Sequence, residues 1–298
     1  MIQLAIIGPT ASGKSDLAIK IARQIDAYIL SIDSLSIYKE IDIVSAKPSK
    51  DELDSIQHFG INVLNPDEYF SVDVFIDIYK DVKQKCKEDN KNLIIVGGTS
   101  FYLKSLLQGL SPLPKIDSKV EKLVEEKLKN LEFTYKYLSN LDYLYMKNID
   151  SKDKYRIEKA LLIYEASNTT PSEWFKKNPP IPIIEDLEIY NIDVDREILR
   201  DRISKRTKKM FNLGLIDEVC YLEQKYTRRP NSMGSIGIVE VLEYLDANVT
   251  KEQMLENIST HTAQLAKRQQ TFNKTQFKNI TNASLQELEK VILSKFKS

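Results

Sequence analysis

The chain has 298 residues, 42% of them hydrophobic, which is enough for a buried core in one large or two modest domains. Its 43 basic and 43 acidic residues cancel, which excludes a bulk polycation, so any nucleic-acid binding must depend on local basic patches. Two isolated cysteines and the lack of an apolar run of 18 residues argue against disulfides, structural zinc and membrane spans, and favour a reducing cytosol.

The first third of the chain alternates short apolar runs with helix-like segments. Residues 2–7 form the first run, and residues 16–25 repeat apolar side chains at helical spacing. Further apolar runs cover residues 28–32 and 92–96. Because strands that alternate with helices form parallel sheets, we predict an α/β fold with a parallel sheet flanked by helices. Ligands then bind beyond the carboxyl ends of the strands.

Residues 8–15 read Gly-Pro-Thr-Ala-Ser-Gly-Lys-Ser and fit the P-loop pattern G-x-x-x-x-G-K-S without a mismatch. Such a loop turns backbone N–H groups toward a polyphosphate and leads into a helix N-terminus. Lys14 would neutralise a phosphate, and the Ser15 hydroxyl would bind Mg²⁺, the one cofactor predicted. The expected phosphate-binding residues of the loop are Gly8, Thr10, Ala11, Ser12, Gly13, Lys14 and Ser15. The motif makes the fold P-loop NTPase-like but does not specify the reaction.

Two polar residues follow the later strands. A carboxylate at Asp33 would face the phosphate edge, where it holds Mg²⁺ through water or acts as a general base. The alternative for Asp33 is a solvated turn at the end of a strand. Thr99, after Gly97-Gly98, offers a hydroxyl to a ligand or simply ends a tight turn. His58 has no second ligand at metal-binding spacing, so we expect no metal site there.

Two proline-rich stretches, 111–114 and 178–182, bracket the middle of the chain. Between them, helical patterns cover 119–131 and 154–167 with little strand signal, and a returning strand is expected at 187–192. We therefore predict a core interrupted by a mostly helical insertion. The expected limits are 1–114 for the first part of the core, 115–182 for the insertion and 183–298 for the second part with C-terminal helices.

Residues 196–213 are predicted to form a helix closed by Gly214. Its apolar stripe contains Leu199, Ile203, Met210 and Leu213. Arg206 falls inside this stripe and Arg202 on its edge, and an unpaired guanidinium on a buried face is costly. Arg206 therefore either pairs with a buried carboxylate or faces an anion. The opposite, solvated side is expected to hold Lys205, Lys208 and Lys209.

Basic residues also gather at two places that could face nucleic acid. Arg156 and Lys159 share one flank of the insertion helix. Residues 266–278 contain four basic residues and no acid, interleaved with Phe272 and Phe277. That mixture suits a nucleic-acid surface, and an ordinary amphipathic helix is the alternative.

These motifs together resemble the bacterial tRNA dimethylallyltransferase, or tRNA isopentenyltransferase, family over nearly the whole chain. The matching segments are Gly8–Ser15, Asp33-Ser34 with Tyr38, Ala46–Pro48, Gly97–Thr99 with Tyr102, Gly109–Pro114, Arg156 with Ala160-Leu161 and Tyr164-Glu165, Gly214–Val219 and Ala266–Gln269. Where the family usually has other residues, this chain has Ser100, Tyr155, Lys159, Gly234, Ile238 and Phe272. The departures concern tRNA contacts more than the reaction.

The resemblance implies transfer of a dimethylallyl group from dimethylallyl diphosphate to N6 of the adenosine 3′-adjacent to the tRNA anticodon. Asp33 would act as the general base, and Thr99 would bond an oxygen at the reaction centre. The P-loop, Mg²⁺, Arg202 and Arg206 would stabilise the leaving diphosphate. The implied contacts to the anticodon stem-loop are Asp33, Ser34, Leu35, Ser36, Thr99, Lys122, Arg156, Lys159, Lys267 and Arg268. We expect a cytoplasmic monomer.

Three alternative functions stay open beside this interpretation. A P-loop kinase of a small molecule or nucleotide would consume ATP. An isopentenyltransferase acting on a free nucleotide would need no long insertion. A non-catalytic RNA-binding P-loop protein would not need Asp33, Thr99 and Arg206 around the loop.

Overall fold

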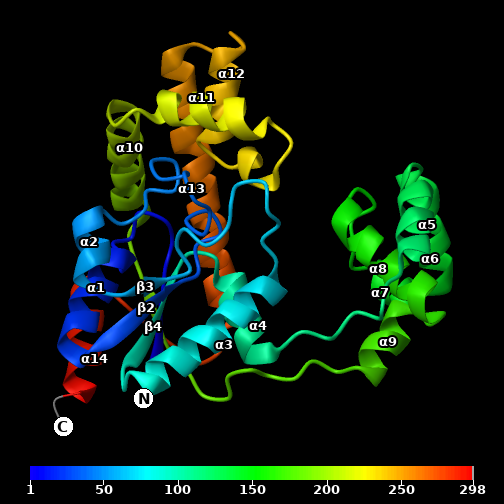
Figure 1. Ribbon diagram of the computed structural model, residues 1–298, viewed down its shortest axis with the longest axis horizontal. Coiled ribbons are helices and arrows are strands. Elements are labelled where there is room, and N and C mark those ends of the chain that lie inside the picture. Colours follow the sequence, from blue (N-terminus) through cyan, green and yellow to red (C-terminus); the bar gives the residue numbers. More distant parts are fainter. Residues whose placement is uncertain (297–298) are drawn as a thin grey trace. The chain divides into compact units, whose positions relative to one another are not determined.

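The computed structural model describes residues 1–296 (Figure 1). The chain folds into two compact units, one made of residues 1–106 and 184–298 and the other of residues 107–183. The second unit starts before the first proline-rich stretch and ends just after the second. At its base, the Ile184 backbone N–H donates to the Leu106 carbonyl at 3.0 Å, so the core chain leaves and returns at one point.

A six-stranded sheet forms the centre of the larger unit, and every pairing in it is parallel. The strands, in the spatial order β3-β2-β4-β1-β5-β6, are β3 His58–Phe59, β2 Ala27–Ser31, β4 Asn92–Gly97, β1 Gln3–Ile7, β5 Glu188–Ile192 and β6 Ile280–Ala283. The predicted α/β fold is therefore confirmed. The edge strands β3 and β6 were not predicted, because both are short and half exposed and neither produces an apolar run.

Helices surround the sheet and extend beyond it. Those of the larger unit are α1 Lys14–Ile25, α2 Lys50–Ser55, α3 Val72–Glu88, α4 Ser100–Gln108, α10 Arg196–Asn212, α11 Leu215–Tyr226, the 3₁₀ helix η1 Asn231–Gly234, α12 Ile238–Leu245, α13 Lys251–Gln276 and α14 Leu285–Lys295. Those of the smaller unit are α5 Ser118–Leu128, α6 Leu131–Leu141, α7 Tyr143–Met146, α8 Lys154–Ser167 and α9 Pro171–Lys177. None of the helices in residues 1–296 is long and apolar enough to cross a membrane.

Both faces of the sheet are covered, which explains why the central strands are continuous apolar runs. Side chains from β1, β2, β4 and β5 pack with α1 and α14 into one core cluster. Helix α3 contacts β2 and β4, and Figure 1 shows it running across the sheet together with α4. In β1, residues Leu4 to Ile7 are all at most 1% exposed. A second cluster joins α10, α11, α12 and α13 with the segment between β2 and α2.

The smaller unit is helical, with its own core between α5, α6, α7 and α8. The predicted continuous helix over 119–131 is wrong, because α5 ends at Leu128 and α6 begins at Leu131. Asn130 causes the break. Its side chain accepts the Phe133 backbone N–H at 3.1 Å and so caps a new helix.

The end of α10 also differs from the prediction. The helix stops at Asn212, and Gly214 follows with a φ of 98°, a left-handed conformation that favours glycine. Leu213 therefore lies outside the helix and is 60% exposed, so its assignment to the buried stripe is wrong. Leu199, Ile203 and Met210 are buried as expected.

Candidate phosphate-binding active site

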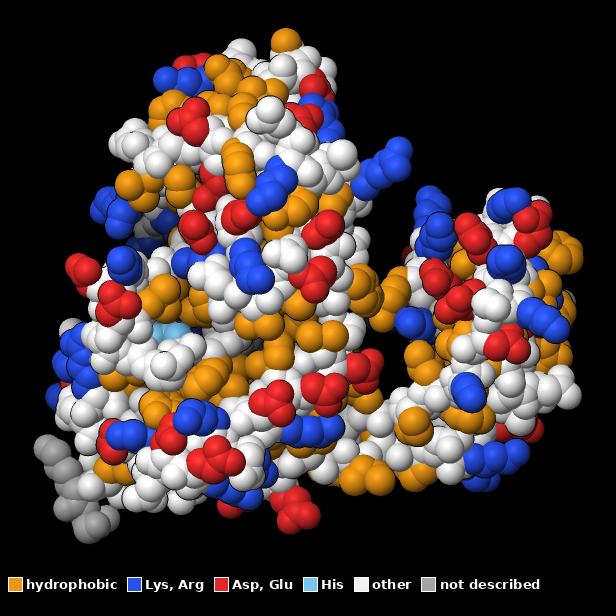
Figure 2. Space-filling view, viewed as in Figure 1, with side chains coloured by type: hydrophobic (Ala, Val, Ile, Leu, Met, Phe, Trp, Pro, Cys, Tyr) orange, Lys and Arg blue, Asp and Glu red, His pale blue; other side chains and the backbone are white. Residues whose placement is uncertain are grey.

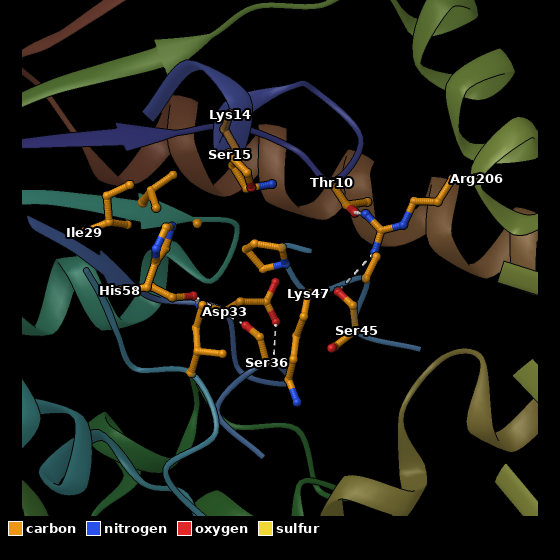
Figure 3. A pocket seen from close by; sticks show the side chains of 16 residues that line it. Thr10, Lys14, Ser15, Ile29, Asp33, Ser36, Ser45, Lys47, His58 and Arg206 are labelled. Atoms are coloured by element: carbon orange, nitrogen blue, oxygen red, sulfur yellow. Dashed lines mark hydrogen bonds between the residues drawn. The ribbon is translucent and has the colours of Figure 1, made fainter. Parts of the chain in front are cut away.

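A pocket lies at the carboxyl edge of the sheet, within the larger unit (Figure 3). Its wall combines the β1–α1 loop, the ends of β2 and β4, the segment 45–48 and one side chain from α10. The lining residues are Thr10, Lys14, Ser15, Ile29, Ser31, Asp33, Ser36, Ser45, Ala46, Lys47, Pro48, His58, Ile61, Val96, Gly97 and Arg206. The sheet topology thus brings together residues that are far apart in the sequence.

The Gly8–Ser15 loop presents an uncapped helix N-terminus. Gly13, at the N-cap of α1, has a φ of 89° and supplies no side chain to bond the first N–H groups of the helix. Ala11 also has a positive φ, 62°, which an alanine adopts only when the surrounding loop holds it there. Free N–H groups and the helix dipole together favour an anion at this loop.

Lys14 extends a charged side chain over the loop. Its Nζ donates to the Pro9 carbonyl oxygen at 3.2 Å, so it folds back over the loop. Burial lowers the pKa of Lys14 to about 8; Asp33 opposes that effect and Arg206 adds to it. An anion bound in the loop would favour the charged form and raise the pKa again.

Arg206 reaches from α10 to the same loop (Figure 3). Its NH1 donates to Thr10 Oγ1 at 3.2 Å, and its NH2 donates to the Ser45 carbonyl at 3.4 Å. No carboxylate within residues 1–296 forms an ion pair with it. Burial lowers its pKa. Asp33 has the opposite effect on the pKa of Arg206, so a carboxylate lies near the guanidinium without forming an ion pair with it. An anion as the partner of Arg206 stays a prediction.

Two further cations of α10 line an outer cleft that adjoins the pocket. Arg202 NH1 donates to the Ser12 carbonyl at 3.2 Å, so it holds the P-loop from outside. Lys209 was predicted on the opposite, solvated side with Lys205 and Lys208. It instead lines this cleft with Arg202 and Arg206, because three-residue and four-residue steps stay on one helix face.

Asp33 lines the pocket, whereas Thr99 is not among the lining residues and is joined to Ser34, the neighbour of Asp33 in sequence. Asp33 Oδ1 accepts the backbone N–H groups of Leu35 at 2.9 Å and Ser36 at 3.3 Å. Its Oδ2 has no hydrogen-bond partner among residues 1–296 and remains free to bond a ligand. Thr99 Oγ1 accepts the Ser34 N–H at 3.3 Å, which ties the end of β4 to the turn after β2.

The Ala46–Pro48 motif is held by groups outside it. Glu218 of α11 accepts the backbone N–H groups of residues 42, 43 and 44 at 2.8 to 2.9 Å. Lys47 Nζ donates to the Tyr38 carbonyl, Asp42 and Asn62, and its side chain is only 4% exposed. Lys47 is therefore a cation with structural partners. His58, whose Nδ1 lies 2.7 Å from the Ile56 carbonyl, is likewise held by the backbone.

The residues expected to contact tRNA lie in different environments. In the larger unit, Ser34, Lys267 and Arg268 are exposed, Leu35 is half-buried and Ser36 is buried. Ser36 therefore supports Asp33 through its backbone. Figure 2 shows basic and acidic side chains intermingled on the visible face, in keeping with the zero net charge.

In the smaller unit, Lys122 and Arg156 are exposed and Lys159 is half-buried. Arg156 pairs with Asp153, the N-cap residue of α8. Lys159 Nζ lies 5.7 Å from the centre of the Tyr155 ring. Both interactions are weak and solvent-accessible, so a phosphate can replace Asp153 or the Tyr155 ring as the partner of the cation.

The aromatic residues near the basic C-terminal segment do not face solvent. Phe277 is buried and Phe272 is half-buried, with ring centres 6.3 Å apart. The basic side chains of that segment, Lys267, Arg268, Lys274 and Lys278, are exposed and available to a partner.

Gln269 makes a polar contact to the P-loop that the sequence did not predict. Its Oε1 accepts the Thr10 backbone N–H at 2.8 Å. The motif Ala266–Gln269 contained the signal, but nothing in a helical pattern indicates which loop a glutamine reaches.

Comparison with known proteins gives one consistent result. The model of the IPP transferase family matches residues 36–276. A tRNA dimethylallyltransferase of Sulfurimonas denitrificans is 69% identical over 99% of both chains, and one of a Sulfurovum species is 57% identical over 98% of this chain and 97% of the relative. The solved tRNA isopentenylpyrophosphate transferase of Bacillus halodurans matches with a TM-score of 0.72 and 26% identity, covering 99% of this chain and 97% of that one. A eukaryotic dimethylallyltransferase acting on tRNA shares the fold, with a TM-score of 0.82 at 23% identity over 95% of this chain and 74% of that one.

The lowered pKa of Lys14 predicts a pH dependence of anion binding. Below pH 8 the lysine is already charged, whereas above it binding must take up a proton. The affinity for inorganic diphosphate should then fall by up to about tenfold per pH unit above pH 8. Calorimetric titration from pH 7 to 9 measures this, and Lys14→Arg, which stays charged, accounts for the ionisation of diphosphate itself. Identical pH profiles for the two proteins would contradict the prediction.

Proposed function

The chain belongs to the IPP transferase family, and on that premise we propose that it transfers a dimethylallyl group from dimethylallyl diphosphate to a tRNA adenosine. The acceptor atom is N6 of the adenosine 3′-adjacent to the anticodon, and diphosphate is released. The observation that carries the proposal is Arg206, a half-buried guanidinium beside a P-loop that hydrogen-bonds only to neutral oxygens among the described residues. An anionic donor would supply the missing negative charge.

The donor diphosphate is proposed to bind the Gly8–Ser15 loop. The uncapped N-terminus of α1 and the charges of Lys14 and Arg206 are all available there. As the bond between the allylic carbon and the diphosphate oxygen breaks, negative charge grows on that oxygen. These groups then stabilise the leaving group more than the substrate, which lowers the barrier. Arg202 supports the loop through the Ser12 carbonyl.

Asp33 is the proposed base. N6 of the adenine attacks the allylic carbon, the carbon–oxygen bond breaks, and the proton of N6 passes to Asp33 Oδ2. The hydrogen bonds that Leu35 and Ser36 donate to Oδ1 fix the carboxylate while leaving Oδ2 available. Thr99, held by Ser34, is proposed to bond an oxygen at the reaction centre. The base must first leave its stack, which costs a few kcal/mol.

Mg²⁺ fits the donor set of the pocket. The Ser15 hydroxyl is exposed and has no hydrogen-bond partner in the described chain, so it can hold the ion while Asp33 Oδ2 stays available as the base. Residues 1–296 contain no cluster of three or more acidic, histidine or cysteine ligands, so the substrate phosphates would complete the coordination, as Mg²⁺ commonly requires. When bound, the ion would neutralise charge on the diphosphate.

The tRNA anticodon stem-loop is the proposed partner of basic residues in both units, namely the exposed Lys122, Arg156, Lys267 and Arg268 and the half-buried Lys159. Local patches of this kind suffice for one arm of a tRNA, so the zero net charge is no obstacle. Such an acceptor implies a cytoplasmic enzyme, and we propose that it acts as a monomer.

A single assay tests the proposal against its alternatives. The protein is mixed with Mg²⁺, dimethylallyl diphosphate and unmodified tRNA, and the tRNA is digested and analysed by mass spectrometry. We expect a dimethylallyl adduct on one adenosine next to the anticodon. Parallel reactions contain AMP in place of tRNA, or ATP in place of the donor. An adduct on AMP alone would favour the free-nucleotide enzyme, ATP consumption would favour a kinase, and no reaction would favour a non-catalytic RNA-binding protein.

The role of Asp33 predicts a specific loss. Asp33→Asn keeps an oxygen for the Leu35 and Ser36 N–H groups but cannot accept a proton, so turnover should fall by at least about 100-fold. The dissociation constant for tRNA should stay within about twofold, because the change leaves phosphate contacts intact. Single-turnover kinetics and filter binding measure the two quantities. Turnover near the wild-type rate would remove Asp33 as the base.

The role of Arg206 predicts a loss at the leaving group. Arg206→Ala removes a donor that strengthens as charge develops, so the single-turnover rate should fall by roughly 100- to 1000-fold. Lys208→Ala, an exposed lysine two positions away on α10, is the matched control and should change the rate by less than about twofold. An unchanged rate and diphosphate affinity in Arg206→Ala would show a purely structural guanidinium.

A further inference from the structure

Helix α13 turns a polar face toward the carboxyl edge of the sheet. Ala266 is buried against α10, while Gln269, one turn on, points at the Gly8–Ser15 loop. Asn273, a further turn along, is fully buried and donates to Asn191 of β5 at 2.9 Å. This stretch of α13 is therefore fixed to the ends of the central strands by side-chain amides, not by apolar contacts alone.

The Gln269 amide has a defined orientation. Its Oε1 must face Thr10, because the Thr10 backbone N–H can only donate, and the two atoms lie 2.8 Å apart. Its Nε2 then faces Gly98. A Cβ atom at position 98 would lie 2.4 Å from that nitrogen, a distance that no side chain tolerates. Gly98 is thus required for the close approach of Gln269, which gives a physical reason for the second glycine of Gly97-Gly98-Thr99.

Thr10 connects Gln269 to the charge at the centre of the site. Its backbone N–H is held by Gln269 from α13, and its hydroxyl accepts Arg206 NH1 from α10 at 3.2 Å. The position of the Thr10 main chain therefore determines the position of the Thr10 hydroxyl, which is one of the two neutral oxygens that accept hydrogen bonds from Arg206. If the Gln269 bond were lost, Thr10 would lose its support from α13, and the guanidinium would lose a fixed acceptor.

We propose that Gln269 is a positioning residue of the donor site, which fixes Thr10 and, through it, Arg206 in the geometry that receives diphosphate. This inference rests on the proposed function for its reaction, but its geometry concerns anion binding alone. Gln269 lies next to the exposed Lys267 and Arg268 in sequence, so the helix that presents basic residues to tRNA also holds the loop for the donor. It acts through Thr10 and needs no contact with the reacting atoms.

Gln269→Met tests the proposal, because methionine keeps the length of the side chain without a strong acceptor. The dissociation constant for inorganic diphosphate should rise roughly three- to tenfold, the loss expected for one neutral hydrogen bond. The dissociation constant for tRNA and the melting temperature should be unchanged. Gln264→Met, an exposed glutamine without a hydrogen-bond partner in the described chain, is the matched control on the same helix. Equal diphosphate affinity in wild type and Gln269→Met would overturn the proposal, as would an equal loss in the control.

A double-mutant cycle distinguishes positioning from a local structural effect. Thr10→Val removes the acceptor of Arg206, so adding Gln269→Met to it should weaken diphosphate binding by no more than about twofold further. Fully additive losses would overturn the route through Thr10. Should Gln269→Met fail to fold, Gly98→Ala supplies the same test by displacing the amide. Because binding of inorganic diphosphate needs no tRNA, a failed transfer assay with wild-type protein would overturn the proposed function and leave this inference to be decided by affinity.

Discussion

The constraint on which the site depends is the positive charge of Arg206, which forms no ion pair within the described residues. Arg206 is bonded only to a hydroxyl and a carbonyl, and the pKa of Lys14 is lowered by burial beside it. Such an arrangement costs free energy and persists because the surrounding structure holds it in place. Under the proposed function, the diphosphate would remove that cost on binding, so part of the free energy of folding would be recovered as affinity and as stabilisation of the leaving group.

The rest of the larger unit can be understood as support for that charge. The parallel sheet brings the ends of β1, β2 and β4 to one edge. Glu218 fixes the segment that contributes the Ser45 carbonyl, by accepting three consecutive backbone N–H groups. Gln269 fixes Thr10. Each neutral partner of Arg206 is therefore itself held by a side chain from a different helix, which makes the geometry rigid.

The sequence predicted the features that depend on local pattern and missed those that depend on distant contacts. The P-loop and the central strands follow from short motifs and periodicity, and the structure agrees with them; Arg206, predicted on a buried face, is half-buried. The strands β3 and β6 were missed because edge strands need no apolar run. Lys209 was grouped with the solvated lysines, although its spacing from Arg202 and Arg206 puts it on their face, and Leu213 was misplaced because the helix ends one residue before it. Gln269 was overlooked because a glutamine in a basic helix carries no sign of its partner.

The backbone hydrogen bond between Ile184 and Leu106 has a consequence for how the insertion can change in length between related proteins. It holds the two ends of the insertion together within the core, whatever lies between them. A longer or shorter insertion then changes only the entropic cost of closing the loop between these two residues, and that cost grows slowly with the number of residues. The sheet and its charged pocket are thereby insulated from changes in the helical unit. If the helical unit contacts the acceptor as proposed, recognition can change by insertion and deletion while the phosphate-binding pocket stays the same.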